Sequence, residues 1–289
     1  MQYFVSIENT TYFLWQIELL IESFKRHNLE DKLVIAIAEN NNPVSGEYQT
    51  NLMNHKNKFL HFNHEVKFKN KFLGLWAALE KKMLTYPFAI IHPDMVLYKP
   101  IKDDSITSDV TFSIEQETEF IQNNFIKNYI NEIKEITHME EDLPSIPLGG
   151  VLVFNKEIEY LCKRLFFNAD KLLELEQPQD TSFKLEKSVW ILTLIEAALK
   201  LFGNSKNIKL GTGAFEQTLM HHDVHNNFIH YKHGLPPDWS KYQFLFGQYA
   251  FMWNGAGPYD SLLKVNGTSS TNYVCELIES YKKLLKHDS

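Results

Sequence analysis

The sequence predicts an α/β fold with a mixed, mostly parallel sheet flanked by helices. Its opening reads as strand, helix and strand over residues 3–7, 12–27 and 33–38, with apolar side chains at helical spacing in the middle segment. The run 33–38 is apolar without alternation, which is typical of a strand covered on both faces, and 86–91 reads as another buried strand. In such a doubly wound layer, ligands bind beyond the carboxyl ends of the strands.

The remaining elements follow in order along the chain. Helices are expected at 72–84, 121–136, 158–174, 185–201 and about 272–286. A further strand is expected at 109–114, and a glycine pair leads into another strand at 147–155. The stretch from about residue 210 to the final helix reads mostly as loop. Because no repeat or linker divides the chain, we expect a single domain that ends in a loop-rich extension.

The composition of the sequence limits the classes of protein to which the chain can belong. With 289 residues, 44% of them hydrophobic, the chain can bury a sizeable core. A net charge of −7 argues against a protein that coats nucleic acid, which needs a positive surface. No run of about 18 apolar residues and no leader peptide stands out, so we expect a cytoplasmic protein without a membrane anchor. The only cysteines, Cys162 and Cys275, lie far apart and predict neither a disulfide framework nor a cysteine zinc site.

Several common nucleotide and hydrolase motifs do not occur in the sequence. There is no phosphate-binding G-x-x-x-x-G-K-[ST] loop, no G-x-G-x-x-G after the first strand and no G-x-S-x-G elbow. The only arginines, Arg26 and Arg164, fall in segments that read as helices away from the strand ends. A bound diphosphate would therefore be met by lysines, backbone amides and a metal rather than by an arginine fork.

Two groups of residues could hold a metal ion. His92 and Asp94 directly follow the strand 86–91, and in an extended segment residues two apart point the same way. Five of the chain's twelve histidines lie between residues 221 and 233. Among them, His230 follows an apolar residue and reads as an inward histidine on a buried strand, which fits either a hydrogen-bonded core residue or a metal ligand.

Two further features each allow a structural and a functional interpretation. Glu186 lies near the start of a predicted helix, where it could complement the helix dipole or act as a general base. The stretch 55–71 carries five lysines against the single acid Glu65, with three phenylalanines interleaved. It fits an amphipathic element with a solvated lysine face as well as it fits a nucleic-acid contact.

The order of these pieces resembles the plant hydroxyproline O-arabinosyltransferases and peptidyl serine galactosyltransferases, which are GT-A glycosyltransferases. The resemblance rests on Tyr3–Asn9 with Tyr12, Trp15 and Gln16, then Asn70-Lys71, His92-Pro93-Asp94-Met95, Glu186–Trp190 and Ile229-His230-Tyr231. His233-Gly234 through Lys241 is also similar to the His-Gly-Pro-Trp-Lys endings of other GT-A enzymes.

This resemblance implies a GT-A fold, a UDP-linked sugar as donor and Mn²⁺ or Mg²⁺ bridging its phosphates. Residues 1–115 would form the nucleotide-sugar-binding half, and 116–289 the acceptor side with the C-terminal extension. Asp94 and His230 would be metal ligands. His92 stands where the family has an aspartate, so it would bind the metal less strongly, favour Mn²⁺, or contact the donor instead.

The resemblance also implies roles for other residues. The donor side is expected to consist of Ser6, Glu8, Asn9, Lys71, His92, Gly149, Gly150, His233 and Lys241. Glu186 is the expected carboxylate at the acceptor, and Asp180 and Asp223 are the alternatives to it.

The acceptor is open at this stage. The plant relatives work behind a membrane anchor, whereas the soluble enzymes of T-even phages glycosylate hydroxymethylcytosine in DNA, so 5-hydroxymethylcytosine is the leading hypothesis for this chain. In that case the enzyme would act in the cytoplasm of an infected host. The alternatives are a protein or glycan hydroxyl as acceptor, a non-catalytic nucleotide-sugar or glycan-binding module, and a metal hydrolase built on the histidine cluster.

Overall fold

The structure is a computed structural model. It describes residues 1–9, 11–39, 56–63, 70–113, 131, 135, 150–156, 209–218, 226–231 and 269–287. All statements on the fold refer to these residues.

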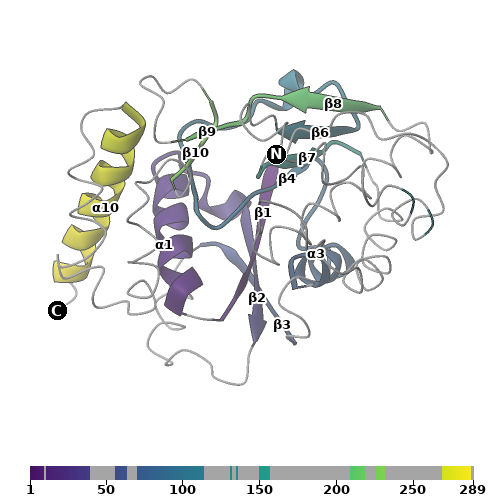
Figure 1. Ribbon diagram of the computed structural model, residues 1–289. Helices are drawn as coiled ribbons and strands as arrows, with labels where there is room; N and C mark the ends of the chain where they lie inside the picture. The colour runs from purple at the N-terminus through teal and green to yellow at the C-terminus, as the bar shows by residue number, and fades with distance from the viewer. Residues whose placement is uncertain are drawn as a thin grey trace.

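A seven-stranded sheet forms the centre of the described part (Figure 1). Its strands are β1 (Gln2–Glu8), β2 (Leu33–Glu39), β3 (Lys58–Asn63), β4 (Phe88–Ile90), β6 (Val110–Ser113), β7 (Leu152–Phe154) and β8 (Leu210–Gly213). They are arranged in the order β3-β2-β1-β4-β7-β6-β8. Strand β7 runs antiparallel to both of its neighbours, while the other neighbouring pairs are parallel. The predicted mixed, mostly parallel sheet is therefore confirmed.

A second, smaller sheet branches from the end of β4. It consists of β5 (Met95–Leu97), β10 (Phe228–His230) and β9 (Glu216–Thr218), with β10 in the middle, antiparallel to β5 and parallel to β9. The stretch 210–230 thus contributes three strands: the buried strand that carries His230, which the sequence predicted, and β8 and β9, where it predicted loop. Each has only three or four residues, too few to show a period, and its hydrogen-bond partners lie far away in the sequence.

Helices α1 (Thr11–Lys25) and α3 (Asn70–Glu80) lie on opposite sides of the main sheet (Figure 1). Both match predicted helices within a few residues. Two short 3₁₀ turns, η1 (Glu30–Lys32) and η2 (Asp103–Ser105), complete this part of the chain. The helices predicted at 121–136, 158–174 and 185–201 lie wholly or largely outside the described residues.

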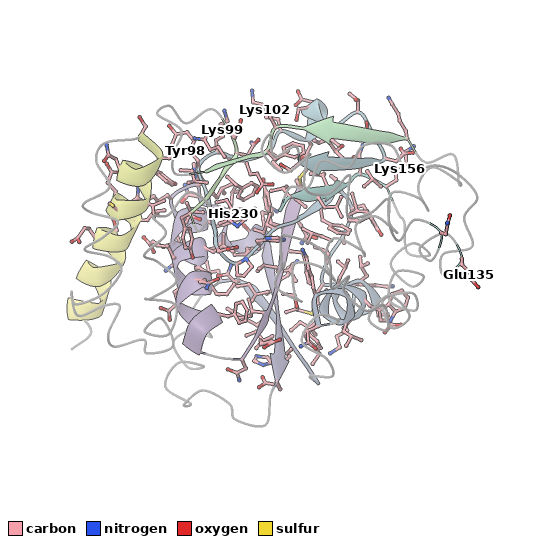
Figure 2. The ribbon with its side chains drawn as sticks, viewed as in Figure 1. Tyr98, Lys99, Lys102, Glu135, Lys156 and His230 are labelled. Carbon is pink, nitrogen blue, oxygen red and sulfur yellow. The ribbon has the colours of Figure 1, made fainter. Side chains whose placement is uncertain are left out.

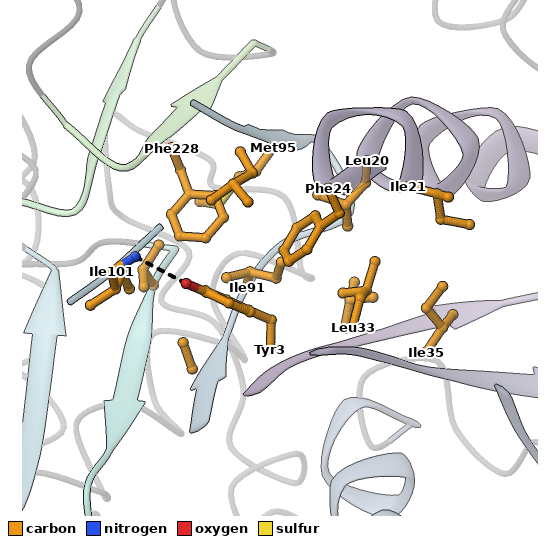
Figure 3. Close-up of a cluster of buried hydrophobic side chains, with 14 of the residues drawn as sticks. Tyr3, Leu20, Ile21, Phe24, Leu33, Ile35, Ile91, Met95, Ile101 and Phe228 are labelled. Atoms are coloured by element: carbon orange, nitrogen blue, oxygen red, sulfur yellow. Dashed lines mark hydrogen bonds between the residues drawn. The ribbon is translucent and has the colours of Figure 1, made fainter. Parts of the chain in front are cut away.

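Strand β1 shows why its sequence is apolar on both sides. Tyr3, Val5 and Ile7 join Phe24 and other α1 side chains in one buried cluster (Figure 3). The Tyr3 ring packs edge-on against Phe24 and Phe228, with centroids 5.0 Å and 5.9 Å away, and its hydroxyl oxygen accepts a hydrogen bond from the Ile101 amide. Tyr3 therefore connects the main sheet, α1 and the smaller sheet.

The opposite face of β1 and β2 packs against α3 through a glycine. A Cβ atom added at Gly74 would lie 2.8 Å from Ala36 Cβ and 2.9 Å from Ser6 Oγ. The Ser6 hydroxyl also donates a hydrogen bond of 3.1 Å to the Asn70 carbonyl oxygen. A larger side chain at position 74 would push the helix away from the strands.

The C-terminal helix α10 (Ser269–His287) fastens the smaller sheet to α1, beside which it lies in Figure 1. The Tyr273 hydroxyl donates to the Leu97 carbonyl at 2.7 Å, and the Gln217 amide donates to Ser270 Oγ at 2.8 Å. The Arg26 guanidinium lies 5.3 Å from the centre of the Tyr273 ring. Among the described helices, none is both long and apolar enough to cross a membrane.

Replacing Gly74 by alanine is expected to destabilise the protein. The new methyl would overlap Ala36 Cβ, which cannot rotate away, and such overpacking costs about 1–3 kcal/mol. This exceeds the gain of about 1 kcal/mol in helix propensity. Urea unfolding of Gly74→Ala beside the exposed control Glu80→Ala measures the difference. A higher urea midpoint for Gly74→Ala would show that helix propensity outweighs the overlap.

Candidate metal centre

Two strands of the smaller sheet place Asp94 beside His230. The chain leaves β4, turns at Pro93 and Asp94, and enters β5 at Met95, which is the register partner of His230 in β10. The Tyr231 amide donates a hydrogen bond of 3.2 Å to the Asp94 carbonyl oxygen, which fixes this register. The predicted extended conformation of residues 92–94 was therefore wrong, because they form a loop that ends in a turn.

His92, Asp94 and His230 nevertheless converge as predicted. One donor atom from each lies within 4.8 Å of the other two. His230 Nε2 is 3.1 Å from Asp94 Oδ2, and the two imidazole rings stand edge to face with centroids 5.7 Å apart. Donors at right angles around a cation, each at about 2.1 Å, would be about 3.0 Å apart. This set of side chains therefore fits a divalent metal ion.

A fourth residue, Glu216 on β9, completes the surroundings of His230 and was missed by the sequence analysis. Its Oε2 lies 3.2 Å from His230 Nδ1. Its Oε1 accepts hydrogen bonds from the backbone amides of Gly150 and Val151. Strand β9 is three residues long and lies in a segment read as loop, so no sequence period indicated that Glu216 points inward.

His230, labelled in Figure 2, is only 3% exposed. Its protonation reflects the two carboxylates around it. Burial acts to lower the pKa of His230, but Asp94 and Glu216 more than offset it and raise the pKa to about 10. Without a metal, an imidazolium bridges the two acids at neutral pH. A metal ion bound at Nε2 would take the place of a proton.

Gly150 brings the backbone close to this centre. A Cβ atom at this position would lie 2.3 Å from Met95 Cε, 3.1 Å from His92 Nδ1 and 3.2 Å from Glu216 Oε2. The resemblance implied a place for Gly150 on the donor side, and the groups that it approaches in the structure are Met95, His92 and Glu216. Contact of Gly150 with the donor stays a prediction.

The metal centre lies at the place where a doubly wound sheet binds ligands. From β1 the chain winds outward to β2 and β3, and then returns to the other side of β1 as β4. The order of the strands thus reverses between β1 and β4, which makes this position the switch point of the sheet. His92 and Asp94 follow β4 there, while Glu8 ends β1 and Asn9 follows it.

The other predicted donor-side residues are only partly described. Asn9 is buried and its amide donates a 2.7 Å hydrogen bond to Glu39 Oε2, whereas Glu8 and Lys71 are half-buried. A role for these residues and for Ser6 in nucleotide binding stays a prediction. The predicted site residues outside the described ranges are Gly149, Asp180, Glu186, Asp223, His233 and Lys241.

The basic stretch 55–71 contains strand β3, which forms one edge of the main sheet. Phe59 packs against the hydrophobic core, and Phe62 lies beside Gly74 of α3. These two rings are engaged in packing the sheet. Their position favours the structural interpretation of this stretch over base stacking.

Comparisons with known proteins return glycosyltransferase structures. The bifunctional glycosyltransferase WbbM is 12% identical with a TM-score of 0.49, over 96% of this chain and 51% of that one. The galactosyltransferase LgtC, in complex with donor and acceptor sugar analogues, is 11% identical with a TM-score of 0.47, over 97% and 96%. A glycosyltransferase involved in glycosylation of the PBCV-1 major capsid is 12% identical with a TM-score of 0.44, over 86% and 100%.

The chain thus spans about half the length of WbbM. No protein-family model matches the sequence, and no curated protein matches it. At identities of 12% or less and TM-scores under 0.5, these likenesses do not by themselves assign an activity to the chain.

Metal binding at this centre is expected to release about one proton at pH 7.5, because His230 is protonated below its raised pKa of about 10. The association constant for Mn²⁺ should therefore rise roughly tenfold per pH unit between pH 6.5 and 8.5. Titration calorimetry in buffers of different protonation enthalpy measures how many protons are released when Mn²⁺ binds. His230→Asn should lose this release and His61→Asn should keep it. Equal release by wild type and His230→Asn would contradict the assignment.

Proposed function

We propose that this chain is a metal-dependent GT-A glycosyltransferase that transfers a sugar from a UDP-sugar to an acceptor hydroxyl. The observation that carries the proposal is the His92, Asp94 and His230 donor set at the switch point between β1 and β4. Nucleotides bind at such points in doubly wound sheets. The resemblance of the motifs along the sequence to plant arabinosyl- and galactosyltransferases supports the same class.

In this reaction the acceptor oxygen forms a bond to the anomeric carbon, and the bond from that carbon to the diphosphate breaks. A divalent cation would supply Lewis-acid stabilisation of the departing UDP. Asp94, His230 and His92 would hold the cation, while Glu8 and Asn9 lie at the end of β1 where the nucleoside is expected. Glu186, or Asp180 in its place, is the proposed carboxylate at the acceptor side, where it would accept the proton that the acceptor hydroxyl loses.

The donor set bears on which cation the protein uses. With His92 in place of the family's aspartate, the donor set of two imidazoles and one carboxylate is softer than a set with a second carboxylate. Imidazole suits later first-row metals, whereas Mg²⁺ prefers oxygen ligands. Of the two cations expected from the sequence, Mn²⁺ is therefore the one proposed here.

Arabinose, galactose and glucose are the sugars that the resemblance suggests, and 5-hydroxymethylcytosine in DNA is the proposed acceptor. The support for DNA is that the soluble enzymes of T-even phages glycosylate hydroxymethylcytosine, together with the exposed Lys56 and Lys58 at the start of β3. A protein or glycan hydroxyl is the alternative, and it would not need the base stacking for which Phe59 and Phe62, packed in the sheet, do not serve.

A UDP-release screen tests the proposal. The protein with Mn²⁺ is incubated with UDP-glucose, UDP-galactose or UDP-arabinose. The acceptors are hydroxymethylcytosine DNA, the same DNA with cytosine, a hydroxyproline peptide, or none. We expect release above the no-acceptor background only with hydroxymethylcytosine DNA. Release with the hydroxyproline peptide alone would mean that the acceptor is a protein hydroxyl, while the protein would still be a glycosyltransferase. UDP and Mn²⁺ binding without any release would favour a binding module.

Asp94→Asn should lower the rate of UDP release at least about 100-fold, because an amide is a weak ligand for a divalent cation. The control Asp104→Asn, in the exposed η2 turn, should stay within about twofold of wild type. Full activity in Asp94→Asn, with loss in His221 or His222 variants, would place the metal in the histidine cluster instead.

His92→Asp is expected to shift cation preference from Mn²⁺ toward Mg²⁺, because it replaces an imidazole by a harder oxygen ligand. The ratio of the two dissociation constants should change by about tenfold. Asn28→Asp, which adds the same charge in the exposed turn after α1, is the control. An unchanged ratio would indicate that His92 is not a ligand.

A further inference from the structure

Glu216 is well placed to act on the metal centre through His230. Strands β9 and β10 are parallel neighbours in which Glu216 pairs with Phe228 and Thr218 pairs with His230. Side chains two residues apart share one face of a strand, so Glu216 and His230 lie on the same face of the smaller sheet. The distance from Glu216 Oε2 to His230 Nδ1 is 3.2 Å.

Both carboxylate oxygens of Glu216 have fixed partners. Oε1 accepts from the amides of Gly150 and Val151, and Oε2 faces His230 Nδ1. The side chain is 3% exposed, so water does not compete strongly for it. Gly150 has no side chain to crowd this contact, whereas a Cβ there would lie 2.3 Å from Met95 Cε and 3.2 Å from Glu216 Oε2.

We propose that Glu216 is a positioning residue that holds His230 in the tautomer able to bind a metal ion at Nε2. A carboxylate cannot donate a proton when ionised, so the ring nitrogen that faces it must carry the hydrogen. Without a metal, Nε2 also carries a hydrogen, toward Asp94. When a metal ion replaces that hydrogen, Nδ1–H would still donate to Glu216, which leaves the Nε2 lone pair for the metal. A histidine ligand whose second nitrogen is held by a carboxylate is a recurrent arrangement in metal sites.

This inference rests on the proposed function for the presence of a metal, but it concerns metal binding and not sugar transfer. It also assigns a role to Gly150 and Val151. Their amides donate hydrogen bonds to the Glu216 carboxylate, which in turn contacts His230. The residues just before β7 of the main sheet are therefore linked through Glu216 to His230 of the smaller sheet. Asp94 and His92, by contrast, come from the loop and turn after β4.

Glu216→Gln is the most informative variant because it preserves shape and removes only the second acceptor. The amide oxygen of glutamine can still accept from the Gly150 and Val151 amides. Its NH₂ group then faces His230 Nδ1, and it can only donate. That contact favours the opposite tautomer, with hydrogen on Nε2, where the lone pair is needed for the metal.

The test is a titration with Mn²⁺ alone, without sugar or nucleotide, followed by the electron paramagnetic resonance signal of free Mn²⁺. Loss of such a supporting partner weakens metal binding by about 10- to 100-fold, and we expect this for Glu216→Gln. Glu80→Gln, at the exposed end of α3, should bind within about twofold of wild type. An unchanged affinity in a folded Glu216→Gln protein would reduce Glu216 to a structural role and overturn the inference.

A second measurement does not depend on the variant's folding. Histidine ¹⁵N chemical shifts and long-range couplings of wild type loaded with diamagnetic Zn²⁺ report which ring nitrogen carries hydrogen. We expect His230 to carry it on Nδ1, and hydrogen on Nε2 or metal at Nδ1 would overturn the inference. Because neither measurement uses a sugar, weaker Mn²⁺ binding without UDP release would sustain the inference and refute the proposed transferase. Absence of metal binding in wild type would refute both.

Discussion

The burial of His230 between Asp94 and Glu216 is the constraint on which much of the described structure depends. Removing charged groups from water costs several kcal/mol per ion unless each is paired and hydrogen-bonded. His230 meets a carboxylate on each side, and Glu216 in turn meets two backbone amides. These contacts exist only if β5, β9, β10 and the start of β7 are all in register. The polar centre therefore specifies how the smaller sheet attaches to the main one.

The two sheets are stabilised in different ways. The main sheet is held by apolar packing on both faces, as the contacts of Tyr3 with Phe24 of α1 and of Ala36 with Gly74 of α3 illustrate. The smaller sheet has short strands and depends on α10, whose Tyr273 and Ser270 bond to β5 and β9 residues. Helix α10 thus supports β5 and β9, the strands on either side of β10, which carries His230 of the candidate site at the end of β4.

This arrangement also gives the metal centre its chemical character. His230 lies on β10, while His92 and Asp94 lie in the loop and turn between β4 and β5, directly beside strands of known register. The burial of His230 strengthens the electrostatic interactions that it makes. Met95 lies at the start of β5 in the buried core, and Glu8 lies at the carboxyl end of β1.

The sequence by itself determined the helices α1 and α3, the buried strands β1 and β2, and the nomination of His92, Asp94 and His230. These follow from apolar periodicity and from residue types at strand ends, which are local properties. Glu216, the short strands β8 and β9, and the turn at Pro93 and Asp94 were decided by tertiary structure. A strand of three or four residues shows no clear period of its own, and the partner of Glu216 lies on another strand. Only the pairing of β9 with β10 and the hydrogen bonds from the Gly150 and Val151 amides bring that carboxylate to the candidate metal centre.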